Sequence, residues 1–239
     1  MNIYAPLEHA FGIPQVMQAS VLAILLVCAA GWVLQRQIVA AGGGVIPDEG
    51  VTFRNVIEVI VGAIANMAKD LMGDEWRSYF PIVGAIFVFV LISNVLHAIP
   101  GMGGATSDVN TTTAWAIISF AVYNYVGIKT HGFWYINQFL GPSFFDVHIM
   151  GKKFHFRPLF FFFFPLEIAL HLARILTLSV RLLANMFADH TVVTVWVGLV
   201  PIVIPAIFMG LGLLIAVLQA FVFSLLTMIY INLAQAEAH

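Results

Sequence analysis

The sequence has little charge and almost no cysteine. Only 9% of its 239 residues are Asp, Glu, Lys or Arg, whereas about 25% is usual in soluble domains, and this shortage excludes a water-soluble protein. The 10 basic residues nearly balance the 12 acidic residues, so the charge gives no support for nucleic-acid binding. The single cysteine, Cys28, has no second cysteine to pair with, which excludes an intramolecular disulfide.

Motifs of catalysis and metal binding are also missing. The sequence contains no Gly-x-Ser-x-Gly element, no Walker-type loop and no His-Glu-x-x-His element. No two histidines are spaced three or four residues apart, as a pair of metal or haem ligands on one helix would be. We therefore expect no metal, no cofactor and no reaction catalysed by this chain alone.

What the sequence has instead is long runs without charge. A helix needs roughly 20 mostly apolar residues to cross a bilayer. Windows of this length without Asp, Glu, Lys or Arg are His9 to Gln35, Ser78 to Ser107, Val109 to Ile128, and His190 to Ala236. We expect the chain to be a polytopic integral membrane protein. The expected spans before residue 130 are 17–35, 79–99 and 113–128.

One segment between these spans has a mixed pattern. Over residues 51–72, Arg54, Glu58, Lys69 and Asp70 interrupt an otherwise apolar sequence. This pattern is typical of an amphipathic helix that lies along the membrane surface.

The distribution of Lys and Arg predicts the orientation, because cytoplasmic loops carry the excess of these residues. Segments 1–16 and 100–112 contain none, whereas 36–78 and 129–157 contain four each. The N-terminal segment 1–16 is therefore expected outside, the 51–72 helix on the cytoplasmic side, 129–157 as a cytoplasmic loop and the C-terminus in the cytoplasm.

The most informative segment is 158–198, which is apolar enough for lipid and yet carries ionisable groups. At about 100° per residue, its polar side chains fall within about 40° of one line along a helix, except His190. These aligned residues are Glu167, His171, Arg174, Arg181, Asn185 and Asp189. Charges at membrane depth are costly, so such residues need a partner or a function.

The spacing of these residues along the helix indicates which of them can have a partner and which is expected to have a function. Glu167 and His171 are four residues apart and can meet, and Arg174 can extend its alkyl stem towards the cytoplasmic interface. Arg181 lies about 21 Å from Glu167 along a helix, and the nearest acid on its own helix, Asp189, is eight residues away. We therefore expect Arg181 to be functional.

Length adds a second constraint. A helix over 158–198 would extend roughly 60 Å, twice the hydrocarbon thickness, so it must either break or lie strongly tilted. Pro201 and Pro205 are the first strong breakers after it. Residues 206–235 then supply a second long helix, and the simplest arrangement is a tilted antiparallel hairpin. The expected fold is all-α, with about five membrane-embedded helices and one amphipathic interfacial helix.

Four sequence elements resemble one family. They are the run from Arg181 to His190, the run from Leu218 to Tyr230, Ser93 to Pro100, and Asp108 to Thr112. Together they resemble subunit a of the F-type ATP synthase. The Arg-x-x-x-Asn-Met element combined with the Gln-Ala-Phe element is the specific part of this resemblance.

The resemblance implies a stator subunit that holds two offset aqueous half-channels against a rotating c-ring and so couples proton flow to ATP synthesis. Arg181 matches the family's essential arginine, which faces the ring carboxylate, and Glu167 matches the acidic residue of the cytoplasmic half-channel. Four residues match the outer half-channel or the support of the arginine: Asn94, Asn185, His190 and Gln219. The implied partners are the c-ring, the peripheral stalk subunit b, the remainder of the ATP synthase and the lipid bilayer, and the implied location is the bacterial inner membrane.

Two positions depart from the family pattern. Gly212 offers no titratable group where many members have His or Glu, and we hypothesise that Asp189 compensates. His97 stands where many members have an acid. Gly212, Gln219 and Tyr230 fall on about the same face of the last helix, where Gln219 is expected to bond either Arg181 or a backbone carbonyl. Arg174 and Tyr230 are assigned supporting roles. A secondary transporter or ion channel, which also uses midplane charges, is the alternative function.

Overall fold

The computed structural model describes residues 12–40, 50, 52–99, 102, 104–132, 135, 145–149, 152–156, 160–200 and 203–236. Its elements are α2 (Gln15–Ala40), α3 (Phe53–Met72), η1 (Gly73–Glu75), α4 (Trp76–His97), η2 (Ala105–Ser107), α5 (Val109–His131), β1 (Phe145–Ile149), β2 (Lys152–Phe156), α6 (Phe160–Leu199) and α7 (Val203–Ala236). The prediction of an all-α polytopic fold is confirmed. Most of the predicted external segment 1–16 and much of the loop 129–157 lie outside the described residues.

Local signals set several helix ends. The side chain of Thr52 accepts a hydrogen bond from the Asn55 amide at the start of α3, and that of Asp108 accepts from the Asn110 amide at the start of α5. Both helices stop at a glycine with positive φ, Gly73 at 61° and Gly132 at 59°, a conformation that glycine adopts without strain. Helix α5 is therefore longer at both ends than the span expected over 113–128.

A β-hairpin lies within the segment predicted as a loop. Strands β1 and β2 pair antiparallel, with Phe145 opposite Phe156 and Ile149 opposite Lys152. Apolar and polar residues alternate through β1 and through β2 from Lys153 onward, a period of two that is typical of a strand. The hairpin lies inside the segment 129–157, which connects α5 to α6.

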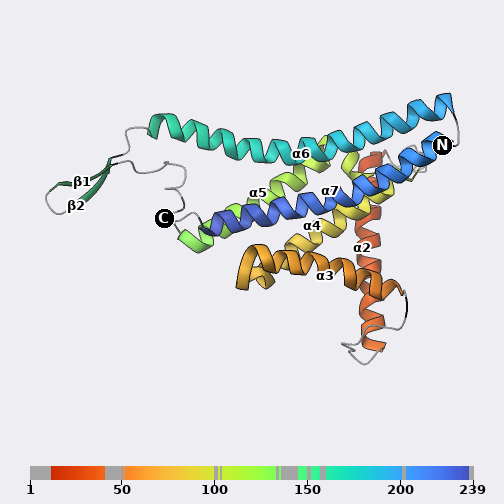
Figure 1. The fold of residues 1–239 in the computed structure, drawn as a ribbon, viewed down its shortest axis with the longest axis horizontal. Helices are drawn as coiled ribbons and strands as arrows, with labels where there is room; N and C mark the ends of the chain where they lie inside the picture. Colours follow the sequence, from red (N-terminus) through yellow and green to blue (C-terminus); the bar gives the residue numbers. More distant parts are fainter. Residues whose placement is uncertain are drawn as a thin grey trace.

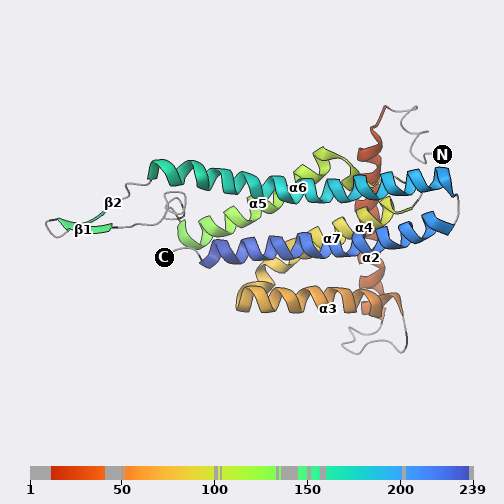
Figure 2. The same ribbon diagram turned by 45° about the horizontal axis from the view of Figure 1, so that its top comes forward.

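The longest elements form a hairpin that dominates the molecule. Helices α6 and α7 run antiparallel along the long axis, and α2 crosses them near one end (Figures 1 and 2). Helix α5 packs on both α6 and α7, while α4 packs on α7 and α2. Helix α3 lies on the far side of α4 from α6.

Helix α6 continues without interruption for 40 residues, although Pro165 lies inside it. Its length is about 60 Å at 1.5 Å per residue. Because the proline falls near the N-terminal end, the hydrogen bond that it removes weakens only the first turns. Of the two sequence alternatives, a break or a tilt, the continuous helix leaves tilt as the way to fit a bilayer about 30 Å thick.

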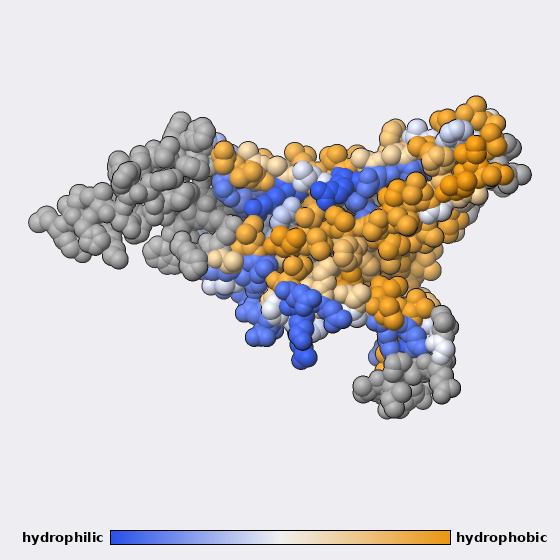
Figure 3. Space-filling view, viewed as in Figure 1, coloured by the Kyte–Doolittle hydropathy of each residue, from blue (hydrophilic) through white to orange (hydrophobic). Residues whose placement is uncertain are grey.

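The surface is largely apolar. Exposed large side chains include Leu176 and Phe187 on α6 and Ile207 on α7, and hydrophobic side chains cover much of the face shown in Figure 3. By length and composition alone, three described helical stretches could cross a membrane: Gln15–Val39, Phe53–His97 and Val203–Ala236. These properties fit a multi-pass membrane protein.

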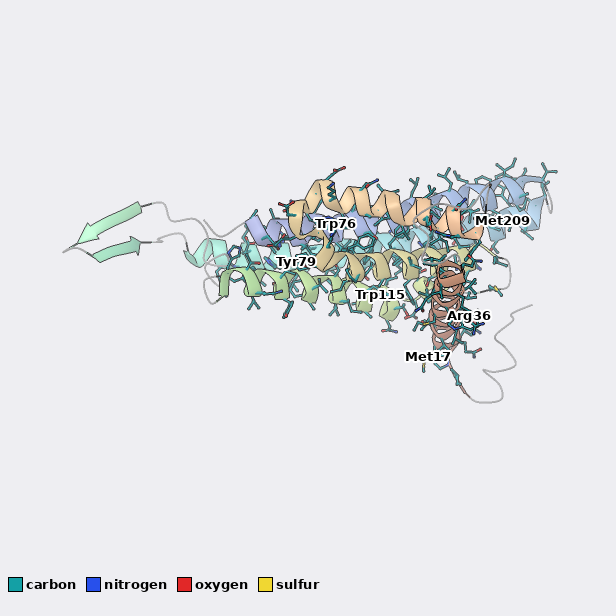
Figure 4. All side chains as sticks on the ribbon, turned by 90° about the horizontal axis from the view of Figure 1, so that it is seen from below. Met17, Arg36, Trp76, Tyr79, Trp115 and Met209 are labelled. Carbon is teal, nitrogen blue, oxygen red and sulfur yellow. The ribbon has the colours of Figure 1, made fainter. Side chains whose placement is uncertain are left out.

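Polar residues gather at the corner where α3 meets α4. Lys69, Asp70 and Glu75 are exposed there, beside Trp76 and Tyr79, which Figure 4 labels at the start of α4. The opposite side of α3 is buried through residues such as Ile64 and Ala68, and it packs on α4 and α7. The amphipathic pattern of this helix therefore separates a packed side from a charged side.

Candidate functional site

The polar residues of α6 follow one side of the helix. Figure 3 shows hydrophilic side chains along α6 crossing an apolar face. His171 is 3% exposed, and Glu167, Arg174, Asn185 and Asp189 are half-buried. Arg181 alone in this row is exposed. The row therefore lies at the edge of the contact that α6 makes with α5 and α7, and Arg181 is its exposed member.

Arg181 stands without a partner within the described part of the chain, where it makes neither an ion pair nor a hydrogen bond. Between residues 173 and 188, the exposed residues of α6 that lie within about 80° of Arg181 at 100° per residue are all small: Ala173, Thr177, Ala184 and Ala188. Large apolar residues, among them Leu176 and Phe187, occupy the far part of that exposed face. The guanidinium is therefore open to approach from outside the subunit.

A carboxamide pair joins the two long helices one turn beyond Arg181. The Asn185 Nδ2 donates to the Gln219 Oε1 at 2.9 Å. Gln219 is 4% exposed, and its Nε2 has no hydrogen-bond partner among the described residues. Neither of the two partners expected from the sequence for Gln219, Arg181 or a backbone carbonyl, is the one found.

Asn94 ties three elements together. Its Oδ1 accepts from the Thr106 hydroxyl of η2 at 2.8 Å, and its Nδ2 donates to the backbone oxygen of Ala216 on α7 at 3.3 Å. The side chain is 1% exposed. Asn94 thus fixes α4 and η2 against α7, one turn before Gln219.

Replacing Asn94 with alanine should destabilise the assembled subunit without touching a titratable group. The substitution leaves the buried Thr106 hydroxyl without its acceptor and removes the bond to the Ala216 carbonyl, which costs about 1–3 kcal/mol. A fall of several degrees in the thermal dissociation temperature of the purified membrane complex would register this loss. Asn110→Ala, the same change at an exposed position, is the control, and equal temperatures for the two variants would contradict the assignment.

Asp189 and Gly212 meet across the hairpin. A Cβ atom at Gly212 would collide with both carboxylate oxygens of Asp189, lying 2.7 Å from Oδ2 and closer to Oδ1. The carboxylate on α6 therefore occupies the volume that a side chain at position 212 on α7 would need. This geometry supports the hypothesis that Asp189 supplies the titratable group that Gly212 lacks.

Two histidines complete this end of the row. The ring centres of His97 and His190 lie 6.0 Å apart, and His190 directly follows Asp189 in the chain. The Gly104 amide donates to His97 Nδ1 at 3.3 Å, and His97 Nε2 lies 3.3 Å from the backbone oxygen of Met186. A neutral ring with its hydrogen on Nε2 satisfies both contacts. These contacts bring His97, which comes from α4, to the α6 group.

A second group lies at the other end of the row. The Glu167 Oε1 is 3.5 Å from His171 Nδ1, which also contacts the Glu167 backbone oxygen at 3.0 Å. The Arg174 guanidinium lies 5.2 Å from the ring centre of Tyr230 and 5.8 Å from that of Tyr123. Arg174 is thus held over two tyrosine rings from α7 and α5, where a cation is attracted to the ring faces. The Arg174 side chain therefore has favourable contacts inside the protein and does not need to reach the cytoplasmic interface of the membrane.

The two groups are separated by Arg181. Along α6, Glu167 lies about 21 Å before it and Asp189 about 12 Å after it at 1.5 Å per residue. Each group contains a carboxylate and a histidine, and these side chains can accept and release protons. Chemically, the arrangement can hold protons on either side of one fixed positive charge.

Comparison with known proteins decides the family. A family model described as the ATP synthase A chain matches residues 17–232. The chain belongs to this family. ATP synthase subunit a 3 of Pelobacter propionicus is 37% identical over 238 residues, which cover 100% of this chain and 95% of that relative. ATP synthase subunit a of Geobacter sulfurreducens is 41% identical over 186 residues, covering 78% of this chain and 76% of the relative.

In this member of the ATP synthase A chain family, the sequence alone did not identify every residue of the candidate site. Tyr123 and Thr106 contact predicted site residues, but each comes from another element and carries no charge that would have marked it. Within the described residues, no group of three or more His, Cys, Asp or Glu is arranged to hold a metal ion.

Proposed function

We propose that this chain is the proton-translocating subunit a of an ATP synthase, and that Arg181 separates two proton half-channels facing a c-ring. The membership of the chain in the ATP synthase A chain family supports the first part. The observation that carries the second part is an exposed guanidinium without an internal partner, lying between two carboxylate–histidine groups.

The charge of Arg181 suits this role. A guanidinium stays protonated at any physiological pH, and an opposite charge a few Å away favours the ionised form of a carboxylate. A ring carboxylate that arrives opposite Arg181 is therefore kept deprotonated as it passes. Because moving one proton through about 100 mV is worth about 2.3 kcal/mol, a charge that blocks direct leakage preserves the energy available for ATP synthesis.

The surface beside Arg181 suits a helical partner. Small residues allow helix backbones to approach closely inside a membrane, and Thr177, Ala184 and Ala188 flank the arginine. We assign this small-residue face to the c-ring and the large apolar residues of the outer helices to lipid. Subunit b and the rest of the complex are expected to contact other surfaces of the chain.

The direction of the pathway follows from the distribution of basic residues. With the N-terminus outside and the C-terminus in the cytoplasm of a bacterial inner membrane, Glu167 and His171 belong to the cytoplasmic half-channel. Asp189, His190 and His97 then belong to the outer half-channel, with Asn94, Asn185 and Gln219 holding the helices between them. The chain itself catalyses no bond cleavage and acts as a membrane subunit of the complex.

Ala184→Phe tests the assigned contact surface. A phenyl group on the small-residue face should keep the ring from approaching Arg181, so ATP-driven proton pumping by membrane vesicles should fall by at least about tenfold, the effect of roughly 1.4 kcal/mol. Leu176→Phe, on the far part of the exposed face, is the matched control and should pump normally. Normal pumping by Ala184→Phe, or equal losses in both variants, would remove the argument for this face.

A further inference from the structure

Tyr123 is a buried residue at the meeting of α5, α6 and α7. It is 2% exposed, and its ring centre lies 6.1 Å from that of His171 and 5.9 Å from that of Tyr230. The Arg174 guanidinium stands 5.8 Å from the same ring. Tyr123 is therefore part of the wall around the group that begins at Glu167.

The hydroxyl of Tyr123 has no hydrogen-bond partner within the described part of the chain. Arg174 and Asn124 approach it without reaching hydrogen-bond geometry. A phenol can donate one hydrogen bond and accept others, and a buried tyrosine ordinarily finds a partner for its hydroxyl. A shielded polar atom therefore belongs to a ring that borders His171 and Arg174.

The packing of the ring does not account for this hydroxyl. A phenylalanine would give the same ring to Arg174 and Tyr230, because the cation is attracted to the ring face. It would also avoid the cost of burying an unsatisfied polar atom. The hydroxyl is thus unfavourable for packing alone, and no residue in the described part of the chain forms a hydrogen bond with it. Buried polar groups of this kind are commonly satisfied by internal water.

We propose that the Tyr123 hydroxyl belongs to the cytoplasmic half-channel, where it binds a water molecule beside His171 and relays protons. This inference rests on the proposed function of the chain. In each transfer the oxygen accepts a proton from one neighbour while its own hydrogen passes to the next, so the phenol is neutral before and after. Arg174, which can only donate, cannot complete such a transfer and instead holds the ring in place.

Tyr123→Phe tests the relay, because it removes the hydroxyl and keeps the ring. In membrane vesicles stripped of the catalytic head of the complex, passive proton conduction should fall about fivefold, the factor that one ordinary hydrogen bond supplies. Tyr125→Phe is the matched control, since Tyr125 lies on the same helix and is 66% exposed. That variant should conduct like the unmodified protein.

A second measurement separates relay from packing. The thermal dissociation temperature of the purified complex should not fall in Tyr123→Phe, because an unsatisfied hydroxyl has been removed and the ring contacts remain. Unchanged proton conduction in Tyr123→Phe would overturn the relay. A lowered thermal dissociation temperature in Tyr123→Phe would also overturn it, because damaged packing would then explain the loss of conduction. ATP-driven pumping by Arg181→Ala, measured in vesicles that keep the catalytic head, keeps the two proposals apart. If Arg181→Ala abolishes pumping while Tyr123→Phe conducts normally, only the role of Tyr123 is wrong.

Discussion

Arg181→Ala should abolish ATP-driven proton pumping while leaving the subunit assembled with its c-ring. The guanidinium makes no ion pair or hydrogen bond within the described residues, so its removal leaves no buried partner unsatisfied and little reason for misfolding. Without the fixed charge, nothing opposite the ring keeps its carboxylate ionised. The measurement is acidification of inverted membrane vesicles on addition of ATP, together with the amount of ring that co-purifies.

The control for this result is another exposed cation. Arg36 lies on α2, with its guanidinium 3.8 Å from the ring centre of Trp32, away from the α6–α7 hairpin. Arg36→Ala should pump normally. Pumping that survives Arg181→Ala would contradict the proposed function, and proton flux through the purified chain without any ring would favour the transporter or channel alternative.

Gly212→Ala should reduce proton flux strongly although it adds only a methyl group. The new Cβ would collide with both oxygens of the Asp189 carboxylate, so that carboxylate must rotate out of the place it occupies between α6 and α7. The helix itself should not suffer, because alanine favours helix by about 1 kcal/mol relative to glycine. Passive conduction by stripped vesicles measures the displacement of the carboxylate.

Gly210→Ala is the matched control for this substitution. Gly210 lies two residues earlier on α7, and a Cβ there would meet nothing within 4 Å. It should conduct normally. Asp189→Asn should reproduce the loss seen in Gly212→Ala, since the amide keeps the shape and loses the titratable proton. Undiminished flux in Asp189→Asn would show that the carboxylate does not carry protons.

Much of the hairpin could be predicted from the chain itself. The spacing of Glu167, Arg174 and Arg181 depends on helical periodicity alone, and it placed these residues in one row before any contact was known. The length of the segment likewise predicted that a continuous helix must tilt. Both predictions depend only on distances along one helix, and the number of residues between two positions determines these distances.

Contacts between helices could not be predicted in this way. Gln219 pairs with Asn185 instead of Arg181 because the register of α7 against α6 depends on how both helices pack on α5 and α4. The same register places Arg174 over Tyr123 and Tyr230, and no spacing within one helix contains that information. The β1–β2 hairpin is different, since the alternation of apolar and polar residues in its strands is a pattern that the sequence itself contains.

The meeting of Asp189 with Gly212 bears on how relatives of this chain should be compared. An alignment read column by column would score position 212 as having lost its ionisable residue. In three dimensions the carboxylate reaches that volume from the facing helix, so the proposed pathway has its group although a different residue provides it. In this family, evolutionary conservation of the proton path should therefore be traced through space across the helix pair, and substitutions at these two positions should be counted together.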